Sequence, residues 1–337
     1  MCICLSKWGS FMKNRKITVV LIICIMLIAV EALSLGRSYQ KKQDDRRISI
    51  IFIAKRTPKS HNYWSEVEQG MKLAALEYNI DLTIIGPPSE TDIWKQNKMI
   101  EEAIEKRPDV IILAPGDYTQ TLPYAEKVEE AGIKLLLLDS VMEEQLGSGV
   151  VATNNYEGGY KMGAYLQKYS DETSVIGIVA HAAGASTAIE RESGVRAGLG
   201  AFENQIVEII YCDSDREKGE TLTLELLERR PEINMLIGLN EDSSRGAASA
   251  VKKLERFSEI YLVGFDSSKE QVQFLEEGIF DALVVQKPLN MGYLGIQTAN
   301  QMARGEKIPE SIDSGSVLIT KDEIYTKENE KLLFPFR

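Results

Sequence analysis

Short runs of β-branched and other apolar residues alternate with helical patterns from residue 48 onward. Between the first two runs, for example, Trp64, Val67, Met71 and Ala74 recur at the spacing of one helix face. Each run is typical of a strand buried on both faces, and strands that alternate with helices predict βαβ units and parallel sheets. Nine such strands with their helices, in a chain of 337 residues, are more than a single hydrophobic core accommodates. We therefore expect two doubly wound α/β lobes. The runs begin at Ile48, Asp81, Asp109, Ile133, Ser174, Gln205, Asn234, Ile260 and Asp281.

A longer apolar segment precedes these runs. Residues 17–30 are uninterrupted, and Glu31 separates them from five further small or apolar residues that end at Gly36. The segment has the length of a signal-peptide core or, counted to Gly36, of a membrane span. Cleavage after Ser34 and an uncleaved anchor both remain open, with the anchor favoured. We therefore expect residues 1–36 to be a signal or transmembrane segment that exports the body, and residues 37–47 to be a charged linker.

The charge is distributed unevenly along the chain. Residues 1–47 contain nine Lys or Arg and three acidic residues, a net +6, which leaves −17 for residues 48–337 out of a total of −11. So acidic a body repels phosphate backbones, which argues against nucleic acid as a partner. Only Cys212 lies in the body, and the chain has two histidines, so no metal site based on Cys or His is expected there.

Polar and aromatic side chains follow the predicted strands where each one ends. In parallel α/β sheets, ligands bind beyond the carboxyl ends of the strands. Carboxylates and amides accept and donate to sugar hydroxyls, an arginine adds a planar set of donors, and aromatic rings cover C–H faces. The set therefore suits an uncharged monosaccharide or related polyol. The candidate ligand-binding residues are Tyr63, Trp64, Asp139, Ser140, Arg191, Asn240, Asp266 and Gln286.

Structural roles remain open for these residues. Tyr63 and Trp64 could belong to the core, Arg191 could lie in a surface ladder, and Asp139, Asn240 or Asp266 could cap helices. Asp213 and Asp215 are expected to cap the helix that follows, and His61 and His181 to be solvent or loop residues. The sequence contains no P-loop, G-x-S-x-G or G-x-G-x-x-G motif, so we expect neither an enzyme nor a cofactor.

Several longer motifs point to a family. They include NYWSEVEQGMKLAALE after the first strand, ATNNYEGGYKMG, ASTAIERESGVRAGL, VGFD and VVQKPLNMGYLG. From about Ile48 to Thr320 the chain resembles periplasmic sugar-binding proteins of the ribose and galactose type, which share their fold with LacI-type effector domains. The resemblance implies a type I periplasmic binding protein whose lobes are joined by a three-crossing hinge near Asn154, Lys287 and Asp313. One lobe would comprise residues 48–154 and 287–313, the other residues 155–286 and 314–337.

The resemblance also assigns site residues. The aromatic pair of the family falls on Tyr63 and Trp64, and its remaining polar positions fall on Asp139, Arg191, Asn240, Asp266 and Gln286. The first lobe departs from the ribose-binding pattern. Ser140 and Ala114 replace an Arg and an Asn, and His61 and Asn62 replace the usual Asn-Pro. The resemblance thus implies a ligand class and not a particular sugar.

Two functions follow from the resemblance and the N-terminal segment. The first is an extracytoplasmic solute-binding protein that captures a monosaccharide or polyol by hinge closure and delivers it to an ABC permease. The alternative is a membrane-tethered sugar sensor whose closed form engages the ectodomain of a histidine kinase. Both place the body on the outer face of the cell membrane, or free in the periplasm or medium if the segment is cleaved. A LacI-type repressor is excluded because an apolar span stands where its DNA-binding domain would be.

Overall fold

The computed structural model describes residues 47–57, 63–144 and 146–334. The chain divides into two units, Met1–Arg47 and Ile48–Arg337, and the fold is that of the second. The predicted signal or transmembrane segment, the linker up to Arg46, and His61 and Asn62 lie outside the described residues. Among the described helices, none has both the length and the apolarity that a membrane crossing requires.

The first sheet of Ile48–Arg337 has the strand order β11-β5-β4-β3-β1-β2, and all of its pairs are parallel. Its central strands are buried on both faces, as predicted, because β-branched and leucine side chains fill both. The edge strand β2 is instead half-exposed. The strands are β1 (Ser49–Ile53), β2 (Asp81–Ile85), β3 (Val110–Leu113), β4 (Lys134–Leu138), β5 (Val150–Ala152) and β11 (Ser311–Asp313).

The second sheet has the order β12-β10-β9-β8-β6-β7. Its strands are parallel except β12, which runs antiparallel to β10 and corrects the expectation of purely parallel sheets. All nine predicted strands are confirmed, whereas β5, β11 and β12 were not predicted. The edge strand β7 is half-exposed, contrary to the prediction of burial on both faces. The strands are β6 (Ile176–Ala180), β7 (Ile206–Tyr211), β8 (Met235–Gly238), β9 (Tyr261–Phe265), β10 (Ala282–Gln286) and β12 (Ser316–Thr320).

Helices connect the strands. Asp213, which was expected to cap the helix after β7, is not its N-cap and forms an ion pair with Lys218 instead. Asp215 accepts a hydrogen bond from the Lys218 amide at the start of α7, which confirms the capping role predicted for it. The helices are α2 (Tyr63–Glu77), α3 (Ile93–Glu105), α4 (Leu122–Glu130), α5 (Asn155–Gln167), α6 (Ser186–Leu199), α7 (Arg216–Arg229), α8 (Glu241–Lys253), α9 (Lys269–Glu277), α10 (Pro288–Ala303) and α11 (Lys327–Leu333).

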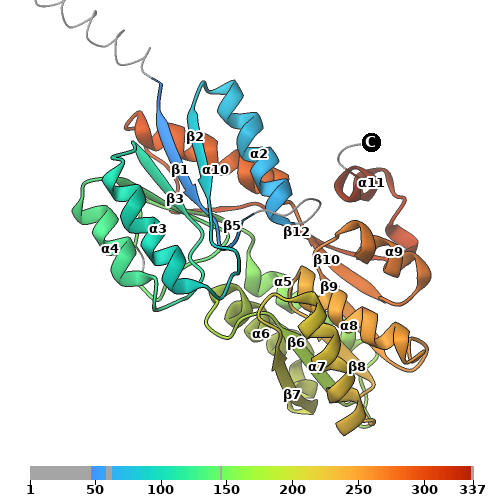
Figure 1. Ribbon diagram of the computed structural model, residues 1–337. Coiled ribbons are helices and arrows are strands. Elements are labelled where there is room, and N and C mark those ends of the chain that lie inside the picture. Colours follow the sequence, from blue (N-terminus) through green and yellow to red (C-terminus); the bar gives the residue numbers. More distant parts are fainter. Residues whose placement is uncertain (1–46, 58–62, 145, 335–337) are drawn as a thin grey trace, which may run out of the picture. The chain divides into compact units, whose positions relative to one another are not determined.

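The chain passes between the two sheets at three places: after β5, after β10, and between β11 and β12. Helix α10 lies beside α2 against the first sheet, and β12 joins the second (Figure 1). We call the first sheet with α2, α3, α4 and α10 the N-terminal lobe, and the second sheet with α5–α9 and α11 the C-terminal lobe. The residue boundaries predicted above for the two lobes stay a prediction.

Glycines allow helices α5 and α6 to pack backbone against backbone. A Cβ placed on Gly159 would lie 2.0 Å from the carbonyl oxygen of Arg191, and one on Gly194 would lie 2.0 Å from that of Tyr156. Backbone atoms cannot move aside as the end of a flexible side chain can. This close packing fixes α6, and with it Arg191, against the start of α5.

We predict that Gly194→Ala lowers the free energy of unfolding by about 1–3 kcal/mol, because the added methyl group forces α5 and α6 apart. Ser193→Ala on the exposed face of the same helix is the control and should change it by no more than about 0.5 kcal/mol. Urea unfolding measures both. Equal effects of the two substitutions would contradict the close packing.

Candidate functional site

Loops at the carboxyl ends of the strands of both lobes form one cleft. Seven of the eight predicted site residues line it, and Ser140 is the exception. The Ser140 hydroxyl donates to the carbonyl of Pro115, and the residue lines a neighbouring pocket of about 250 Å3 beside the chain crossings, which shares Asp139 with the cleft. The cleft is lined by Lys55, Arg56, Tyr63, Trp64, Glu90, Asp139, His181, Thr187, Arg191, Asn240, Glu241, Asp266 and Gln286.

Asp139 is the centre of the contacts on the N-terminal side. It follows β4 with a φ of 67°, a conformation that favours residues such as Asp and Asn among non-glycines and that turns the chain sharply at the strand end. Its Oδ1 accepts from the hydroxyl of Tyr63 at 2.6 Å, and its Oδ2 pairs with Lys55 Nζ at 2.8 Å. Asp139 therefore does not merely cap the next segment, and its charge is balanced within its own lobe.

Asp266 and Gln286 form a buried pair in the C-terminal lobe. Gln286 Nε2 donates to Asp266 Oδ1 at 2.7 Å, while Gln286 Oε1 has no hydrogen-bond partner although the residue is 2% exposed. Burial raises the pKa of Asp266 to about 6, despite the nearby Arg191 and the Gln286 hydrogen bond. Helix α9 begins after Ser268, so Asp266 is not its N-cap. The pair presents acceptor oxygens to the cleft.

Arg191 is buried and holds the C-terminal side of the cleft together. Its Nε donates to Asn155 Oδ1 at 2.9 Å, one terminal nitrogen donates to the carbonyl of Leu239 at 2.7 Å, and its guanidinium lies 3.7 Å from the ring centre of Phe265. These contacts exclude a role in a surface ladder. They also leave part of the guanidinium free to face the cleft, because the fork has five donor hydrogens.

Asn240 begins helix α8 as its N-cap. Its Oδ1 accepts from the Ser243 amide and the Ser243 hydroxyl accepts from the Asn240 amide, a capping box that uses the amide oxygen. The Nδ2 group donates to the hydroxyl of Ser214 in the same lobe at 3.3 Å, and the residue lines the cleft. Asn240 therefore combines the structural role left open by the sequence with a position in the cleft.

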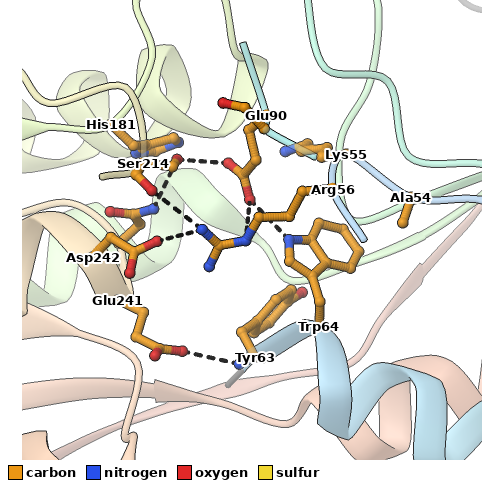
Figure 2. A network of polar contacts seen from close by, with 12 residues as sticks. Ala54, Lys55, Arg56, Tyr63, Trp64, Glu90, His181, Ser214, Glu241 and Asp242 are labelled. Atoms are coloured by element: carbon orange, nitrogen blue, oxygen red, sulfur yellow. Dashed lines mark hydrogen bonds and ion pairs between the residues drawn. The ribbon is translucent and has the colours of Figure 1, made fainter. Parts of the chain in front are cut away.

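Glu241, the first residue of α8, links the two lobes. Its Oε2 accepts from the backbone amide of Tyr63 at 2.9 Å (Figure 2). Burial, reinforced by the negative charges of Asp242 and Asp266, raises the pKa of Glu241 to about 8. Near neutral pH this side chain thus carries a proton for most of the time.

Arg56 crosses the cleft from the N-terminal lobe. Its NH1 lies 2.8 Å from Asp242 Oδ2 and donates to the carbonyl of Ser214 at 3.2 Å, both in the C-terminal lobe. Its Nε lies 3.7 Å from Glu90 Oε1, and Figure 2 shows the guanidinium between Glu90 and Asp242. Burial alone would raise the pKa of Glu90, but Arg56 and Lys55, with hydrogen bonds from Ser214 and Trp64, hold it below its usual value.

Lys55, Arg56, Glu90 and Glu241 were not predicted as site residues. Lys55 and Arg56 come almost directly after β1, so the strand-end rule that selected Asp139 applied to them equally. The sequence analysis assigned the aromatic pair that follows them, Tyr63 and Trp64, to the site instead. Nothing in the sequence indicates that Glu90 and Asp242, distant along the chain, would share one arginine.

Trp64 and His181 line the walls of the cleft. Trp64 is 2% exposed within the core of the N-terminal lobe, and its Nε1 donates to Glu90 at 2.8 Å, so it has both a structural and a lining role. His181 lies in the loop after β6, as expected, but it is 2% exposed and hydrogen-bonded to Thr187, which corrects the alternative of a solvent histidine. Burial, with the positive charges of Arg191 and Lys55, holds the pKa of His181 well below its usual value.

The two lobes contact each other directly around the cleft. The Tyr118 amide donates to the carbonyl of Gly184 at 2.7 Å, and the Val141 amide donates to the Ser186 hydroxyl at 3.0 Å. The space left between the lining side chains is about 30 Å3, which holds two or three water molecules. In this closed arrangement the protein's own side chains fill most of the cleft.

The cleft has the chemistry of a binding site for hydroxyl groups and not of a metal centre. No group of three His, Cys, Asp or Glu side chains in the described part of the chain is arranged to hold a metal ion. The three cations of the cleft, Lys55, Arg56 and Arg191, compensate its carboxylates. The pKa values of two of the carboxyls, Glu241 and Asp266, are raised. A charged ligand would disturb this balance, whereas an uncharged ligand with many hydroxyls would not.

We predict that Glu241→Gln flattens the pH dependence of stability. The folded protein holds the Glu241 proton more tightly than the unfolded chain, so this group's contribution falls as pH rises from its ordinary pKa of 4.5 to about 8. Gln keeps an oxygen for the Tyr63 amide but cannot ionise. The variant should therefore gain stability relative to the wild type with rising pH across this window, as measured by urea unfolding.

The exposed Glu228→Gln on α7 is the control, and its difference from the wild type should stay constant between about pH 5 and about pH 8. A constant difference for Glu241→Gln as well would show that its carboxyl is not held in its protonated form by the closed cleft.

Two relatives of this chain are named for the binding of ribose or allose. A D-ribose/D-allose-binding protein of Pseudomonas aeruginosa is 26% identical over 266 residues, which cover 77% of this chain and 83% of the relative. A ribose import binding protein of Bacillus subtilis is 24% identical over 259 residues, with the same shares of each chain covered.

Solved structures share the fold over most of the chain. A sugar transporter structure from Clostridium phytofermentans is 40% identical, with a TM-score of 0.78, and covers 82% of this chain and 100% of its own. A carbohydrate transporter solute-binding protein from Agrobacterium radiobacter, in complex with D-arabinose, is 25% identical with a TM-score of 0.79, covering 86% and 99%. The model of the periplasmic binding protein domain family matches residues 50–307, more than half of the chain. With its two parallel-dominant sheets and this match, the chain belongs to the periplasmic binding protein family, whose members bind solutes and are not enzymes.

Proposed function

We propose that this protein is a solute-binding protein that captures an uncharged monosaccharide between its two lobes for an ABC sugar transporter. The observation that carries the proposal is the Asp266–Gln286 pair, whose buried acceptor oxygens face the cleft. Gln286 Oε1 is buried without a partner, which is costly, and a sugar hydroxyl would supply the missing donor. The names of the relatives reported above support a sugar of the ribose or allose class.

Each side of the cleft would contribute a different part of the recognition. Asp139 and the hydroxyl of Tyr63 would meet the sugar from the N-terminal lobe, and Arg191, Asn240, Asp266 and Gln286 from the C-terminal lobe. Tyr63 and Trp64, whose rings are 5.1 Å apart and nearly perpendicular, would cover an apolar face of the ring. Ser140 would act indirectly through the loop after β4, because its hydroxyl is bound to Pro115.

Entry of a sugar would require a hinge motion. A monosaccharide has about twelve heavy atoms, too many for a space of about 30 Å3. The lobes would separate at the three chain crossings, admit the sugar and close again in a slightly wider arrangement that ligand contacts stabilise. The predicted lobe boundaries after residues 154, 286 and 313 belong to this proposal.

Transport is the role that the comparisons favour. The relatives and structures reported above are named for sugar binding, import or transport, which supports an ABC permease as partner over the histidine kinase considered from the sequence. The family's periplasmic location supports an extracytoplasmic site of action. Tethering by residues 1–36 remains a prediction from the apolar segment.

A thermal-shift screen of the purified chain tests this function. The panel contains D-ribose, D-allose, D-arabinose, D-fucose and D-tagatose, with D-glucuronate as a charged control. A sugar present at about 100 times its Kd should stabilise the protein by about 2.7 kcal/mol. D-glucuronate should produce no shift, because its carboxylate would face Asp266 and Asp139. Absence of a shift with every neutral sugar would contradict the proposal.

Asp266→Asn locates the site. The substitution keeps the shape and an oxygen for Gln286 but removes the carboxylate that would accept from two hydroxyls, so sugar affinity should fall at least about tenfold. Asp171→Asn, on an exposed loop of the same lobe, should leave affinity unchanged. Arg191→Ala is less suitable, because Arg191 also supports Leu239 and Asn155. Unchanged affinity in Asp266→Asn, measured by calorimetry, would place the sugar elsewhere.

A further inference from the structure

Arg56 occupies the cleft as a ligand would. It is 8% exposed and comes from the loop after β1, yet its closest ion-pair partner, Asp242 at 2.8 Å, and its carbonyl acceptor, Ser214, belong to the other lobe. Glu90 of its own lobe lies on the Nε side of the guanidinium. One side chain thus bridges the two halves of the protein.

The groups that receive Arg56 are themselves held in place. Glu90 accepts from Trp64 Nε1 at 2.8 Å and from the Ser214 hydroxyl at 2.6 Å, and Asn240 donates to that same hydroxyl at 3.3 Å. Figure 2 shows Glu90, Trp64 and Ser214 grouped around the guanidinium. Glu90, Asp242 and Ser214, which come from both lobes, thus form a receptor for a planar group with several donors. The guanidinium of Arg56 occupies this receptor.

Arg56 and a sugar have overlapping requirements. The guanidinium donates to carboxylate and carbonyl oxygens, as sugar hydroxyls would. With Arg56 in its position, the cleft retains only about 30 Å3, room for two or three water molecules. The side chain and a monosaccharide cannot both occupy this closed cleft.

We propose that Arg56 is an internal occupant of the cleft that holds the two lobes together and that a sugar must displace. The displacement rests on the sugar-binding function proposed above, whereas the holding of the lobes does not. Closed protein then exists in two forms, one closed on Arg56 and one closed on ligand. The fraction closed on Arg56 lowers the apparent affinity for the sugar.

Removal of Arg56 has opposite consequences for the two forms. In the form closed on Arg56, the carboxylates of Glu90 and Asp242 would lose the cation that they share, and two buried negative charges would face each other. Opening of the lobes returns both carboxylates to water. The ligand-free variant is therefore expected to open, while its cleft becomes easier for a sugar to enter.

Hydrogen–deuterium exchange of the ligand-free full chain tests the holding role. The reporters are the amides of Tyr118 and Val141, which donate across the cleft to Gly184 and Ser186. In Arg56→Met, both amides should exchange at least about tenfold faster than in the wild type. Asp242→Asn should accelerate the exchange of these amides less, because Arg56 keeps its hydrogen bond to the carbonyl of Ser214 in the other lobe. Core strand amides of both lobes should stay protected, which shows that the variants remain folded.

The matched control is Arg216→Met. Arg216 pairs with Glu270 at 2.6 Å inside the C-terminal lobe and does not line the cleft, so its loss removes a more exposed ion pair without removing a contact between the lobes. Its reporter amides should exchange as in the wild type. Wild-type exchange of both amides in Arg56→Met, or the same acceleration in Arg216→Met, would overturn the proposal.

Chemical rescue tests whether Arg56 acts as an occupant. Arg56→Ala leaves the receptor of Glu90, Asp242 and Ser214 intact, and ethylguanidinium at millimolar concentration should restore slow exchange of the Tyr118 and Val141 amides. Tetramethylammonium, which has the same charge but no donor hydrogens, should not restore it. Failure of ethylguanidinium to slow the exchange would contradict occupancy by the guanidinium.

The displacement is tested with D-ribose by calorimetry. Removal of a form that comprises about nine-tenths of the wild type would tighten the apparent Kd about tenfold in Arg56→Met. Weaker D-ribose binding by Arg56→Met than by the wild type would instead make Arg56 a residue that contacts the sugar, and would overturn the displacement. If the exchange results hold but no sugar of the panel binds, the lobe-holding role stands and the proposed sugar function fails.

Discussion

Charges that are buried between two lobes have to be compensated there, because removing them from water is costly. This constraint explains the arrangement of the cleft. Lys55 pairs with Asp139 inside the N-terminal lobe, whereas Arg56 pairs across the cleft with Asp242. Burial dominates at Glu241 and Asp266, whose pKa values are raised even though Arg245 lies 3.2 Å from Glu241 and Arg191 is near Asp266. The contacts that hold the lobes together therefore also compensate the buried charges of the site.

The same balance makes the cleft suitable for an uncharged guest. A sugar exchanges hydrogen bonds with carboxylates, amides and a guanidinium without changing their total charge, so recognition does not require a new counter-charge. It also means that the protein can satisfy these groups with its own side chains. A binding site that is rich in donors and acceptors has an alternative closed form whenever one long cationic side chain can reach across it, as Arg56 does.

Much of the fold could be predicted from the sequence because burial on both faces leaves a strong pattern. Seven of the nine predicted strands have this pattern, and the half-exposed edge strands β2 and β7 are still mostly apolar in sequence, but β5 and β11 have three residues each and carry too little pattern. The strand-end rule also located Asp139, Asp266 and Gln286. It could not locate the pairing of Arg56 with Glu90 and Asp242, because that depends on how closely the lobes approach. Asn240 shows a further limit, since one side chain both caps a helix and lines the cleft.

The most direct test of this account is a crystal structure of the protein with the sugar from the panel that stabilises it most. The account predicts density for the sugar in contact with Asp266, Gln286 and Asp139, and an Arg56 side chain that has left Asp242. Density outside the cleft would contradict the site, and a sugar in the cleft beside an Arg56 still paired with Asp242 would contradict the competition between them.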